Sequence, residues 1–348
     1  MRTRSNNKID WPAAAEALAR AIPKARLHPR VVVAADAMAP RAVWGVGFSG
    51  GADSLSLLLL LWAHWPRRRA WLRGLHFDHR LRGAASRADA TFCRQVCEAL
   101  GMRYVGGEWP GRHPSVSEAE AREARLGFLG QKARVLWFGH HQDDVAESML
   151  MRLARGSGAG GLAAPRPVQP QPEGRIHLRP LLDLKKSELV AALVAAGVPW
   201  REDASNESED FFRNRIRREV LPAWTEAARR DAVAGAARAR ELIEEDDAAI
   251  EAWLGELPLR APRGGLALGP LAGKPRALLR RALHRWLRAA VPELDLSRAG
   301  FEALLTSVEL GKPTRHSLGR EGFGVIGDGV LRFARVGKTR GKMKRPAN

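Results

Sequence analysis

The sequence has few of the residues that would place it outside the cell or in a membrane. Only two of its 348 residues are cysteines, Cys93 and Cys97, and their spacing of four puts them on one helix face instead of in a CxxC pair. The most apolar run, residues 55–65, has eleven residues and is too short to cross a bilayer. The first residues, MRTRSNNKIDW, lack the apolar segment of a secretory signal. We therefore expect a cytoplasmic protein with no disulfide framework and no membrane association.

Acidic residues are also scarce. The chain has 38 Asp and Glu against 57 Lys and Arg, a formal net charge of +19. Such an excess of cations predicts a polyanionic partner, most simply nucleic acid, with an anionic membrane surface as the other candidate. A GC-rich genome that favours arginine explains part of the arginine content, but it does not explain the scarcity of balancing acids.

Strand-like and helix-like segments alternate between residues 42 and 196. This alternation predicts an α/β fold with a doubly wound, mostly parallel sheet, in which ligands bind at the carboxyl ends of the strands. The expected strands are residues 43–48, 71–78, 103–109, 134–139 and 177–182. The expected helices are residues 11–22, 86–100, 115–132, 142–154 and 187–196, the last capped by Ser187.

The alternation of strand-like and helix-like segments stops after about residue 220, so we expect the chain to have several domains and segments. Residues 1–40 would form an N-terminal helix and linker, and residues 41–222 the catalytic domain. Residues 223–310 read as a smaller helical domain that binds RNA and includes a strongly basic amphipathic helix at 275–291. Residues 311–337 suggest a β-hairpin around Gly327-Asp328-Gly329, and the basic tail at 338–348 is predicted to be disordered.

The stretch that organises the chain is residues 43–54, VWGVGFSGGADS. A short apolar strand is broken by Gly50 and Gly51, and Asp53 and Ser54 follow where a helix should begin. Glycines let the backbone approach a phosphate, and the first N–H groups of a helix point at it with the help of the helix dipole. A Gly-Gly turn by itself more often only connects elements, and the Gly-Lys-Ser/Thr of the common P-loop is missing.

A second informative stretch is residues 139–148, GHHQDDVAES. On a helix, Asp144, Glu147 and Ser148 share one face, beside the imidazole of His140. Carboxylates can hold Mg²⁺ or an ammonium group, and a histidine can move a proton near neutral pH. The neighbouring residues have plainer interpretations, because His141 and Gln142 could cap the helix and Asp143 could point to solvent.

Two further stretches are rich in arginine. Arg122 and Arg125 are spaced to grip a phosphate from one helix face, although an exposed charged helix has the same spacing. Arg213, Arg215 and Arg217 follow the segment 200–206, where a capped basic surface helix is the alternative.

Taken together and in order, these stretches resemble the tRNA(Ile)-lysidine synthetases of the N-type ATP pyrophosphatase, or PP-loop, superfamily. The resemblance covers about residues 42–222. It is carried by the motifs SGGADS, HFDHRLR, EAEAREAR, GHHQDDVAES, RLARGSGAGGL, RPLL and EDASN with RNRIR. Arg80 and Leu126 depart from the usual pattern, which has glycine and an aromatic residue there.

The resemblance implies an adenine-nucleotide α-hydrolase-like domain and a carbon–nitrogen ligase. ATP, with Mg²⁺, would adenylate the wobble cytidine of the isoleucine tRNA with a CAU anticodon and release pyrophosphate. The ε-amine of free L-lysine would then displace AMP to form lysidine. A homodimer is compatible with this resemblance, which does not decide the oligomeric state.

The resemblance also implies roles for individual residues. The expected catalytic residues are Asp53, which also contacts magnesium, Arg122, His140, Asp144 and Glu147. The expected ATP-binding residues are Ser49, Gly50, Gly51, Ala52, Asp53, Ser54, Phe77, Asp78, Arg82, Gly139 and His140. Asp144 and Glu147 would bind lysine, and the phosphate- or tRNA-binding residues would be Arg125, Arg152, Arg213, Arg215 and Arg217.

Three rival interpretations stay open at this point. A tRNA thiolase of the same superfamily would need cysteine chemistry, for which Cys93 and Cys97 are poorly spaced. A metal-dependent phosphohydrolase could use His76, Asp78, His79, His140 and Asp144, but it leaves the glycine-turned helix start without a purpose. A non-catalytic RNA-binding protein would explain the charge but not the carboxylates around one crevice.

Overall fold

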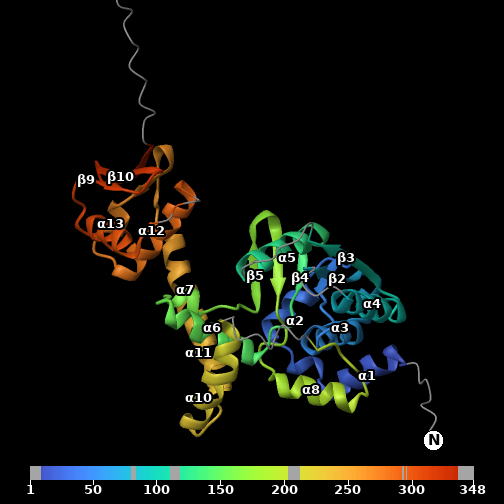
Figure 1. Cartoon of the computed structure of the whole chain (residues 1–348). Helices are drawn as coiled ribbons and strands as arrows, with labels where there is room; N and C mark the ends of the chain where they lie inside the picture. Colours follow the sequence, from blue (N-terminus) through green and yellow to red (C-terminus); the bar gives the residue numbers. More distant parts are fainter. Residues whose placement is uncertain are drawn as a thin grey trace, which may run out of the picture. The chain divides into compact units, whose positions relative to one another are not determined.

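The computed structural model of the chain describes residues 9–79, 84–109, 118–202, 212–291, 294 and 296–335. It divides into two compact units, residues 1–244 and 245–348 (Figure 1). The division lies inside one long helix, α11 (Ala232–Glu256). The predicted tail at 338–348 and the predicted ligand Arg82 lie outside the described residues.

Unit 1 is built on the predicted parallel sheet. Its six strands run in the order β3-β2-β1-β4-β6-β5, and all neighbours are parallel except β5 and β6. The strands are β1 (Trp44–Gly47), β2 (Leu72–Asp78), β3 (Arg103–Glu108), β4 (Val135–Trp137), β5 (Val168–Gln171) and β6 (Arg175–Leu178). The α/β fold class is therefore confirmed. The edge strand β5 was not predicted, because its sequence VQPQ lacks apolar alternation and its proline is tolerated only at a sheet edge.

Helices of unit 1 cover both faces of this sheet. They are α1 (Trp11–Ala21), α2 (Pro29–Asp36), α3 (Ala52–His64), α4 (Ala84–Ala99), α5 (Glu118–Lys132), α6 (Gln142–Ala154), α7 (Ala159–Leu162) and α8 (Lys186–Ala195), with short 3₁₀ turns at Lys24–Arg26, Pro66–Trp71 and Pro172–Gly174. Helix α3 is nearly all apolar because its residues Leu57–Leu61 are buried in the main core. The predicted cap Ser187 is wrong: α8 begins one residue earlier, and the Glu188 carboxylate accepts a hydrogen bond from the Lys185 N–H at 2.9 Å.

The last part of unit 1 is a helical segment that returns to α6. It comprises α9 (Phe212–Arg215), a π-helical turn η5 (Ile216–Val220), α10 (Leu221–Ala228) and the start of α11. Ile216, Leu221 and Ala236 pack against Ala146 and Met149 of α6. A π-helical turn shifts the side-chain register of a helix and occurs often at functional sites. This packing holds the predicted arginines of residues 213–217 against the acidic face of α6.

Unit 2 combines helices with a second sheet. Besides the rest of α11 it has α12 (Arg276–Ala290) and α13 (Arg298–Leu310), which share a core of leucines, and 3₁₀ turns at Pro262–Gly264 and Gly269–Leu271. The antiparallel sheet has the order β7-β8-β11-β10-β9, formed by β7 (Arg260–Ala261), β8 (Gly265–Ala267), β9 (Thr314–Ser317), β10 (Gly322–Gly327) and β11 (Val330–Arg335).

The predicted C-terminal hairpin is present as β10 and β11. Asp328 and Gly329 both have positive φ, 51° and 69°, as a two-residue hairpin turn that follows the strand twist requires. Residues 260–267 lie in the region predicted to be helical, yet they form β7 and β8; strands of two and three residues carry no readable alternation. No helix within the described residues is long and apolar enough to cross a membrane.

Candidate active site

The glycine turn lies between β1 and α3, as predicted. Gly50 has a φ of +89°, a conformation that favours glycine. The Ser54 hydroxyl closes the turn, accepting from the Ser49 N–H at 3.2 Å and donating to the Gly51 carbonyl at 3.1 Å. The N-cap of α3 is Gly51, which has no side chain to occupy the first N–H groups of the helix. The turn can therefore receive a phosphate at a helix N-terminus.

Gly139 brings the second motif against the first. A Cβ atom on Gly139 would lie 2.7 Å from the carbonyl oxygen of Asp53, so only glycine allows this close approach. The backbone after β4 therefore touches the first turn of α3. As a result, the motif around Ser49–Ser54 and the motif around His140–Glu147 form one site.

His141 lies at the centre of this site and joins the two motifs. Its side chain is 1% exposed, and its Nε2 lies 3.5 Å from Oδ2 of Asp53 and 3.4 Å from Oδ2 of Asp144. Its Nδ1 lies 3.3 Å from Oδ2 of Asp143. Burial disfavours the charged ring, but these carboxylates outweigh it and raise the pKa of His141 to about 10. His141 is thus a buried cation at neutral pH.

Two of the carboxylates around His141 have pKa values shifted in the opposite direction, below their usual range. Burial opposes their ionisation, but hydrogen bonding and attraction to His141 lower the pKa of Asp53, and they lower that of Asp143 to about 2. Asp143 also accepts from the Lys186 N–H at 2.9 Å, and Lys186 Nζ lies 4.0 Å from Oδ2 of Asp53. Asp143 therefore belongs to the site, and the alternative that it points to solvent is wrong.

The acidic face of α6 is paired with arginines. Glu147 is fully buried and accepts from Arg213 Nε and Arg217 Nε, each at 2.6 Å. Asp144 accepts from Arg213 Nη2 at 2.5 Å and from the His141 N–H at 3.0 Å. Two residues predicted to bind lysine and two predicted to bind phosphate thus form one buried network. Their roles toward ligands stay predictions.

His140 lies on the other side of the motif and differs from His141. Its Nδ1 accepts from Nε of Arg179 at 3.3 Å. Burial, with the positive charges of Arg179, Arg213, Arg122 and Arg125, holds the pKa of His140 well below its usual range. His140 is therefore neutral at pH 7 and suited to accept hydrogen bonds.

The other predicted ligands have more local contacts. Phe77 and Asp78 end β2, one strand from the glycine turn, and the Phe77 ring packs 5.3 Å from that of Phe128. Arg152 donates to the Gly161 carbonyl of α7. Arg215 lies over the ring of Phe212 at 5.8 Å. Their part in binding ATP or tRNA stays a prediction.

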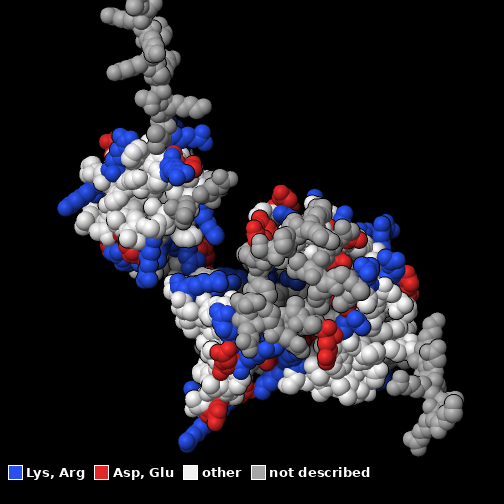
Figure 2. Space-filling model, in the orientation of Figure 1, with Lys and Arg blue, Asp and Glu red and all other residues white. Residues whose placement is uncertain are grey.

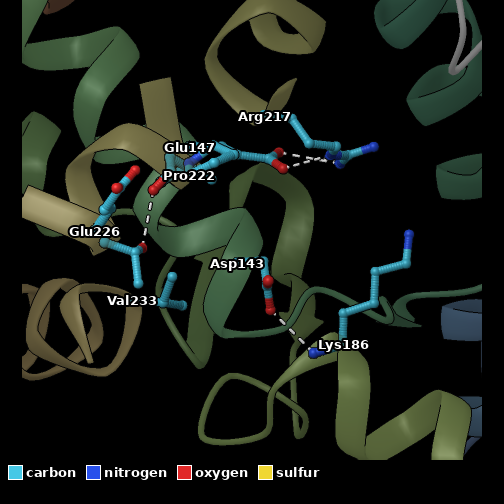
Figure 3. A pocket seen from close by; sticks show the side chains of 9 residues that line it. Asp143, Glu147, Lys186, Arg217, Pro222, Glu226 and Val233 are labelled. Atoms are coloured by element: carbon cyan, nitrogen blue, oxygen red, sulfur yellow. Dashed lines mark hydrogen bonds and ion pairs between the residues drawn. The ribbon is translucent and has the colours of Figure 1, made fainter. Parts of the chain in front are cut away.

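A cavity of about 560 Å³ opens beside the network (Figure 3). One side is charged, with Asp143, Glu147, Lys186 and Arg217, and the other is formed by α10 and the start of α11. Those walls comprise Leu221, Pro222, Thr225, Glu226 and Val233. Charges of both signs face an apolar wall made by Leu221, Pro222 and Val233, which suits a small zwitterion with an aliphatic chain.

Sequence reasoning missed four residues of this arrangement: His141, Asp143, Arg179 and Lys186. His141 and Asp143 stand in the motif GHHQDD, so their position could have been found, but helical spacing does not show which side chains are buried. Lys186 is the first residue of α8, about forty residues further along the chain, and only the fold brings it near Asp53.

The basic helix α12 is less basic than its sequence suggests. Its arginines pair with acids of unit 2: Arg276 with Glu302 and Glu309, Arg280 with Glu302, Arg281 with Asp247 and Glu251, and Arg285 with Glu251. Figure 2 shows that Lys and Arg are spread over the visible face of each unit. A role for residues 223–310 in tRNA binding stays a prediction, and it cannot rest on these four arginines alone.

The cysteines do not fit thiolase chemistry. Cys93 and Cys97 are buried in the main core, and burial raises the pKa of both thiols, that of Cys97 to about 12. A thiolate is the reactive form of cysteine, and neither residue provides it near neutral pH. The two cysteines therefore support packing instead of sulfur transfer.

The residues of the phosphohydrolase alternative do not converge. His76 is buried, with its Nδ1 hydrogen-bonded to the Phe48 carbonyl at 3.0 Å. In the part of the chain that the structure describes, the one His, Cys, Asp or Glu group spaced for a metal is His28, Asp183 and Glu241. None of these three belongs to the predicted metal set.

Comparisons with known proteins give the family of this chain. A family profile described as "PP-loop domain" matches residues 27–224. A tRNA(Ile)-lysidine synthase from Pseudomonas syringae is 38% identical over 296 residues, covering 78% of this chain and 64% of the relative. Another, from Hyphomonas neptunium, is 35% identical over 254 residues, covering 71% of this chain and 68% of the relative.

Coverage and structural likeness complete the comparison. The chain spans between 56% and 64% of the length of three relatives named tRNA(Ile)-lysidine synthase. Among solved structures, a U34-tRNA thiolase from Methanococcus maripaludis with its [4Fe-4S] cluster has a TM-score of 0.47 and 15% identity. That alignment covers 66% of this chain and 78% of the thiolase.

Proposed function

Because this chain belongs to the tRNA(Ile)-lysidine synthase family of PP-loop proteins, we propose that it is an ATP-dependent carbon–nitrogen ligase acting on tRNA. Its substrate would be the isoleucine tRNA with a CAU anticodon, whose wobble cytidine becomes lysidine. The observation that carries the proposal is the contact of His141 with both Asp53 and Asp144. Through this contact the glycine turn lies beside the buried network of Asp144, Glu147 and their arginines.

The proposed reaction has two steps. The O2 of the cytidine attacks the α-phosphorus of ATP, and the bond to pyrophosphate breaks. The ε-amine of lysine then attacks C2, the C2–O bond breaks, and AMP leaves. Adenylation must come first, because the cytidine oxygen is a poor leaving group until it is a phosphate ester.

The first α3 turn is the proposed phosphate site. Backbone N–H groups of Gly51, Ala52 and Asp53, with the hydroxyls of Ser49 and Ser54, would hold the phosphates. The remaining ATP contacts would come from residues after the neighbouring strands. They are the ones expected from the sequence, namely Phe77, Asp78, Arg82, Gly139 and His140. Arg122 and Arg125 would neutralise charge on the adenylated intermediate.

Asp53 suits the expected magnesium ion. Its Oδ1 is buried without a hydrogen-bond partner, while Oδ2 faces His141 and Lys186. A carboxylate oxygen is the ligand type that Mg²⁺ prefers. When bound, the ion would neutralise phosphate charge, and the part of His141 is to orient the Asp53 carboxylate toward it.

Lysine would occupy the cavity beside this network. Its carboxylate would approach Lys186 and Arg217, its methylene groups the apolar wall, and its ammonium groups the carboxylates. Glu147 lines the cavity, but its oxygens already accept from two arginines, so lysine would have to displace an arginine or rely on Asp143 and Glu226 as well. Asp144 is proposed to hold Arg213 and His141 in place while lysine binds.

The test is incorporation of labelled lysine into the purified isoleucine tRNA. We expect incorporation only with ATP, together with release of AMP and pyrophosphate. Asp144→Asn should abolish turnover and leave tRNA affinity near that of the wild type. Sulfur transfer, or no incorporation by well-folded protein, would refute the proposal, and loss of tRNA binding by Asp144→Asn would show that Asp144 is misassigned.

A matched pair of variants tests the lysine cavity. Glu226→Gln removes an exposed carboxylate that lines the cavity, and Glu219→Gln removes one from the preceding π-helical turn that does not line it. We expect the first to raise the KM for lysine several-fold with an unchanged KM for ATP, and the second to change neither. Equal effects of the two variants on lysine would place the lysine site elsewhere.

A further inference from the structure

A histidine and two carboxylates from three separate segments meet in unit 1, and none of them belongs to the candidate active site. His28 is the N-cap residue of α2, Asp183 precedes α8, and Glu241 lies in α11. One ligand atom of each lies within 4.8 Å of the others. Of the His, Cys, Asp and Glu residues that the structure describes, only this group has the spacing of a metal site.

His28 is the reason to regard this group as a binding site. It is 3% exposed, and its Nδ1 is buried without a hydrogen-bond partner. Its Nε2 faces Oε1 of Glu241 at 3.9 Å, beyond hydrogen-bond distance. A dication bound at Nε2, the nitrogen that faces Glu241, would give this buried ring a partner on that side.

The backbone around the three residues is firmly packed. The His28 N–H donates to the Pro180 carbonyl at 2.8 Å, which fixes α2 against the segment that carries Asp183. Leu182 is buried and packs with Ala237, one turn before Glu241 on α11. The three side chains therefore meet because of the fold and not because of a loop conformation.

Neighbouring arginines bind mainly to another carboxylate. Arg240 lies 4.0 Å from Oε1 of Glu241, but its shorter contact is with Glu244 at 2.6 Å, and Arg30 contacts the same Glu244 at 2.9 Å. Arg238 binds the other oxygen of Glu241, Oε2, at 3.0 Å. Oε1 of Glu241 and the Asp183 carboxylate therefore stay on the side that His28 faces.

We propose that His28, Asp183 and Glu241 bind one zinc ion, or a transition-metal dication of similar preference. One imidazole nitrogen with two carboxylates is a ligand set that zinc accepts, with water in a fourth position. Tetrahedral zinc needs ligand atoms about 3.3 Å apart. Rotation of the partly exposed Asp183 and Glu241 side chains can bring them to this distance. The ion would fasten α2 and α11 to the segment before α8.

The experiment uses the full chain after treatment with EDTA. Zinc binding is measured by equilibrium dialysis with metal analysis, and thermal unfolding is followed with and without ZnCl2. We expect one zinc per chain and a higher Tm with zinc, since a ligand of the folded state at 100 times its Kd raises the folded-to-unfolded ratio about 100-fold. Cobalt in place of zinc should give visible absorption bands of a low-symmetry site.

Conservative variants locate the ion. Asp183→Asn and Glu241→Gln should weaken zinc binding more than tenfold and remove the zinc-dependent rise in Tm. Glu245→Gln, an exposed acid one turn further along α11, is the matched control and should bind as the wild type does. The proposal is overturned if the wild type binds no stoichiometric zinc, or if both site variants bind it as tightly as the control.

Discussion

The protein has two arginine clusters that look alike in sequence and differ in structure. The first comprises Arg213 and Arg217, which bind Glu147 of α6; that carboxylate is 0% exposed. The second comprises Arg276 and Arg280 of α12 in unit 2, whose acidic partners Glu302 and Glu309 have side chains 36% and 40% exposed. Both clusters pair guanidinium groups with carboxylates at short distance.

The difference in burial decides what each cluster can do. A buried carboxylate that loses its cations is left with an uncompensated charge, so the first cluster should behave as a single unit. Exposed pairs are screened by water and salt and contribute little to stability. They can also open to meet another anion, such as a tRNA phosphate. The first cluster is therefore suited to hold an active site, and the second to regulate how much positive charge the surface presents.

The largest expected effect comes from removing the buried acceptor. Glu147→Ala should destabilise unit 1 by about 3–5 kcal/mol, because Arg213 and Arg217 would lose the charge that compensates them. It should also abolish lysine incorporation, since the arginines would no longer be held at the cavity. Urea unfolding and the lysine assay measure the two effects.

A conservative variant separates stability from catalysis. Glu147→Gln keeps the shape and one acceptor oxygen, so it should recover part of the stability and none of the turnover. If Glu147→Ala unfolds at the same urea concentration as the wild type, the buried network does not have the energetic importance argued here.

The second-largest expected effect concerns the positive charge of His141 at the centre of the site. In the unfolded chain His141 has an ordinary pKa near 6.5, and in the folded protein it is about 10. The stabilisation by the charged ring is complete below pH 6.5 and is lost as the pH rises toward 10, a loss of the order of a few kcal/mol. The difference in unfolding free energy between the wild type and His141→Gln should therefore shrink over this range. A difference that stays constant from pH 6.5 to 10 would mean that His141 is not charged in the folded state.

Asp143 gives the matching test at low pH. Its pKa is lowered to about 2, so its contribution is present above pH 4 and is lost as the pH falls toward 2. Asp143→Asn should remove this acid-side part and reduce the alkaline dependence of His141 without abolishing it, because Asp53 and Asp144 still face the ring. Complete loss of the alkaline part would show that the two groups titrate as one pair.

The sequence predicted the parts of the site whose chemistry is local. A glycine turn between a strand and an apolar helix has few physical uses, so Gly50, Gly51 and Asp53 could be found without coordinates. Helical spacing likewise put Asp144 and Glu147 on one face. Both predictions depend on neighbours in the chain, and the structure brings the two motifs together through Gly139.

What the sequence did not predict depends on contacts between distant segments. Arg213 and Glu147 are 66 residues apart, and nothing local distinguishes an arginine that meets a carboxylate from one that meets a phosphate. For the same reason the sequence showed residues 275–291 only as a strongly basic amphipathic helix and did not reveal the acids that pair with its arginines. The short strands β5, β7 and β8 were missed because two to four residues are too few to show an alternation of apolar and polar side chains.

A smaller effect is expected for the charged surface of unit 2. If the protein binds tRNA through phosphates, affinity should fall steeply with salt concentration. Arg315 lies over the Phe323 ring at 3.8 Å on the sheet of unit 2. Arg315→Gln should reduce the slope of log K against log salt by about one, uniformly across tRNAs. A flat salt response of the wild type would remove the role proposed for the basic surface.

The smallest effect on stability, and the sharpest test of the comparison, is expected for Glu302→Gln. This exposed acid pairs with both Arg276 and Arg280. Its loss should leave the urea midpoint almost unchanged, because screened surface pairs contribute little. The same change frees Arg280, while Arg276 keeps Glu309 as its partner, so tRNA affinity should rise and depend more steeply on salt. Adding Arg280→Gln to Glu302→Gln should cancel part of this gain. A large loss of stability in Glu302→Gln would instead mean that the exposed cluster is as structural as the buried one, and the distinction between the two would fail.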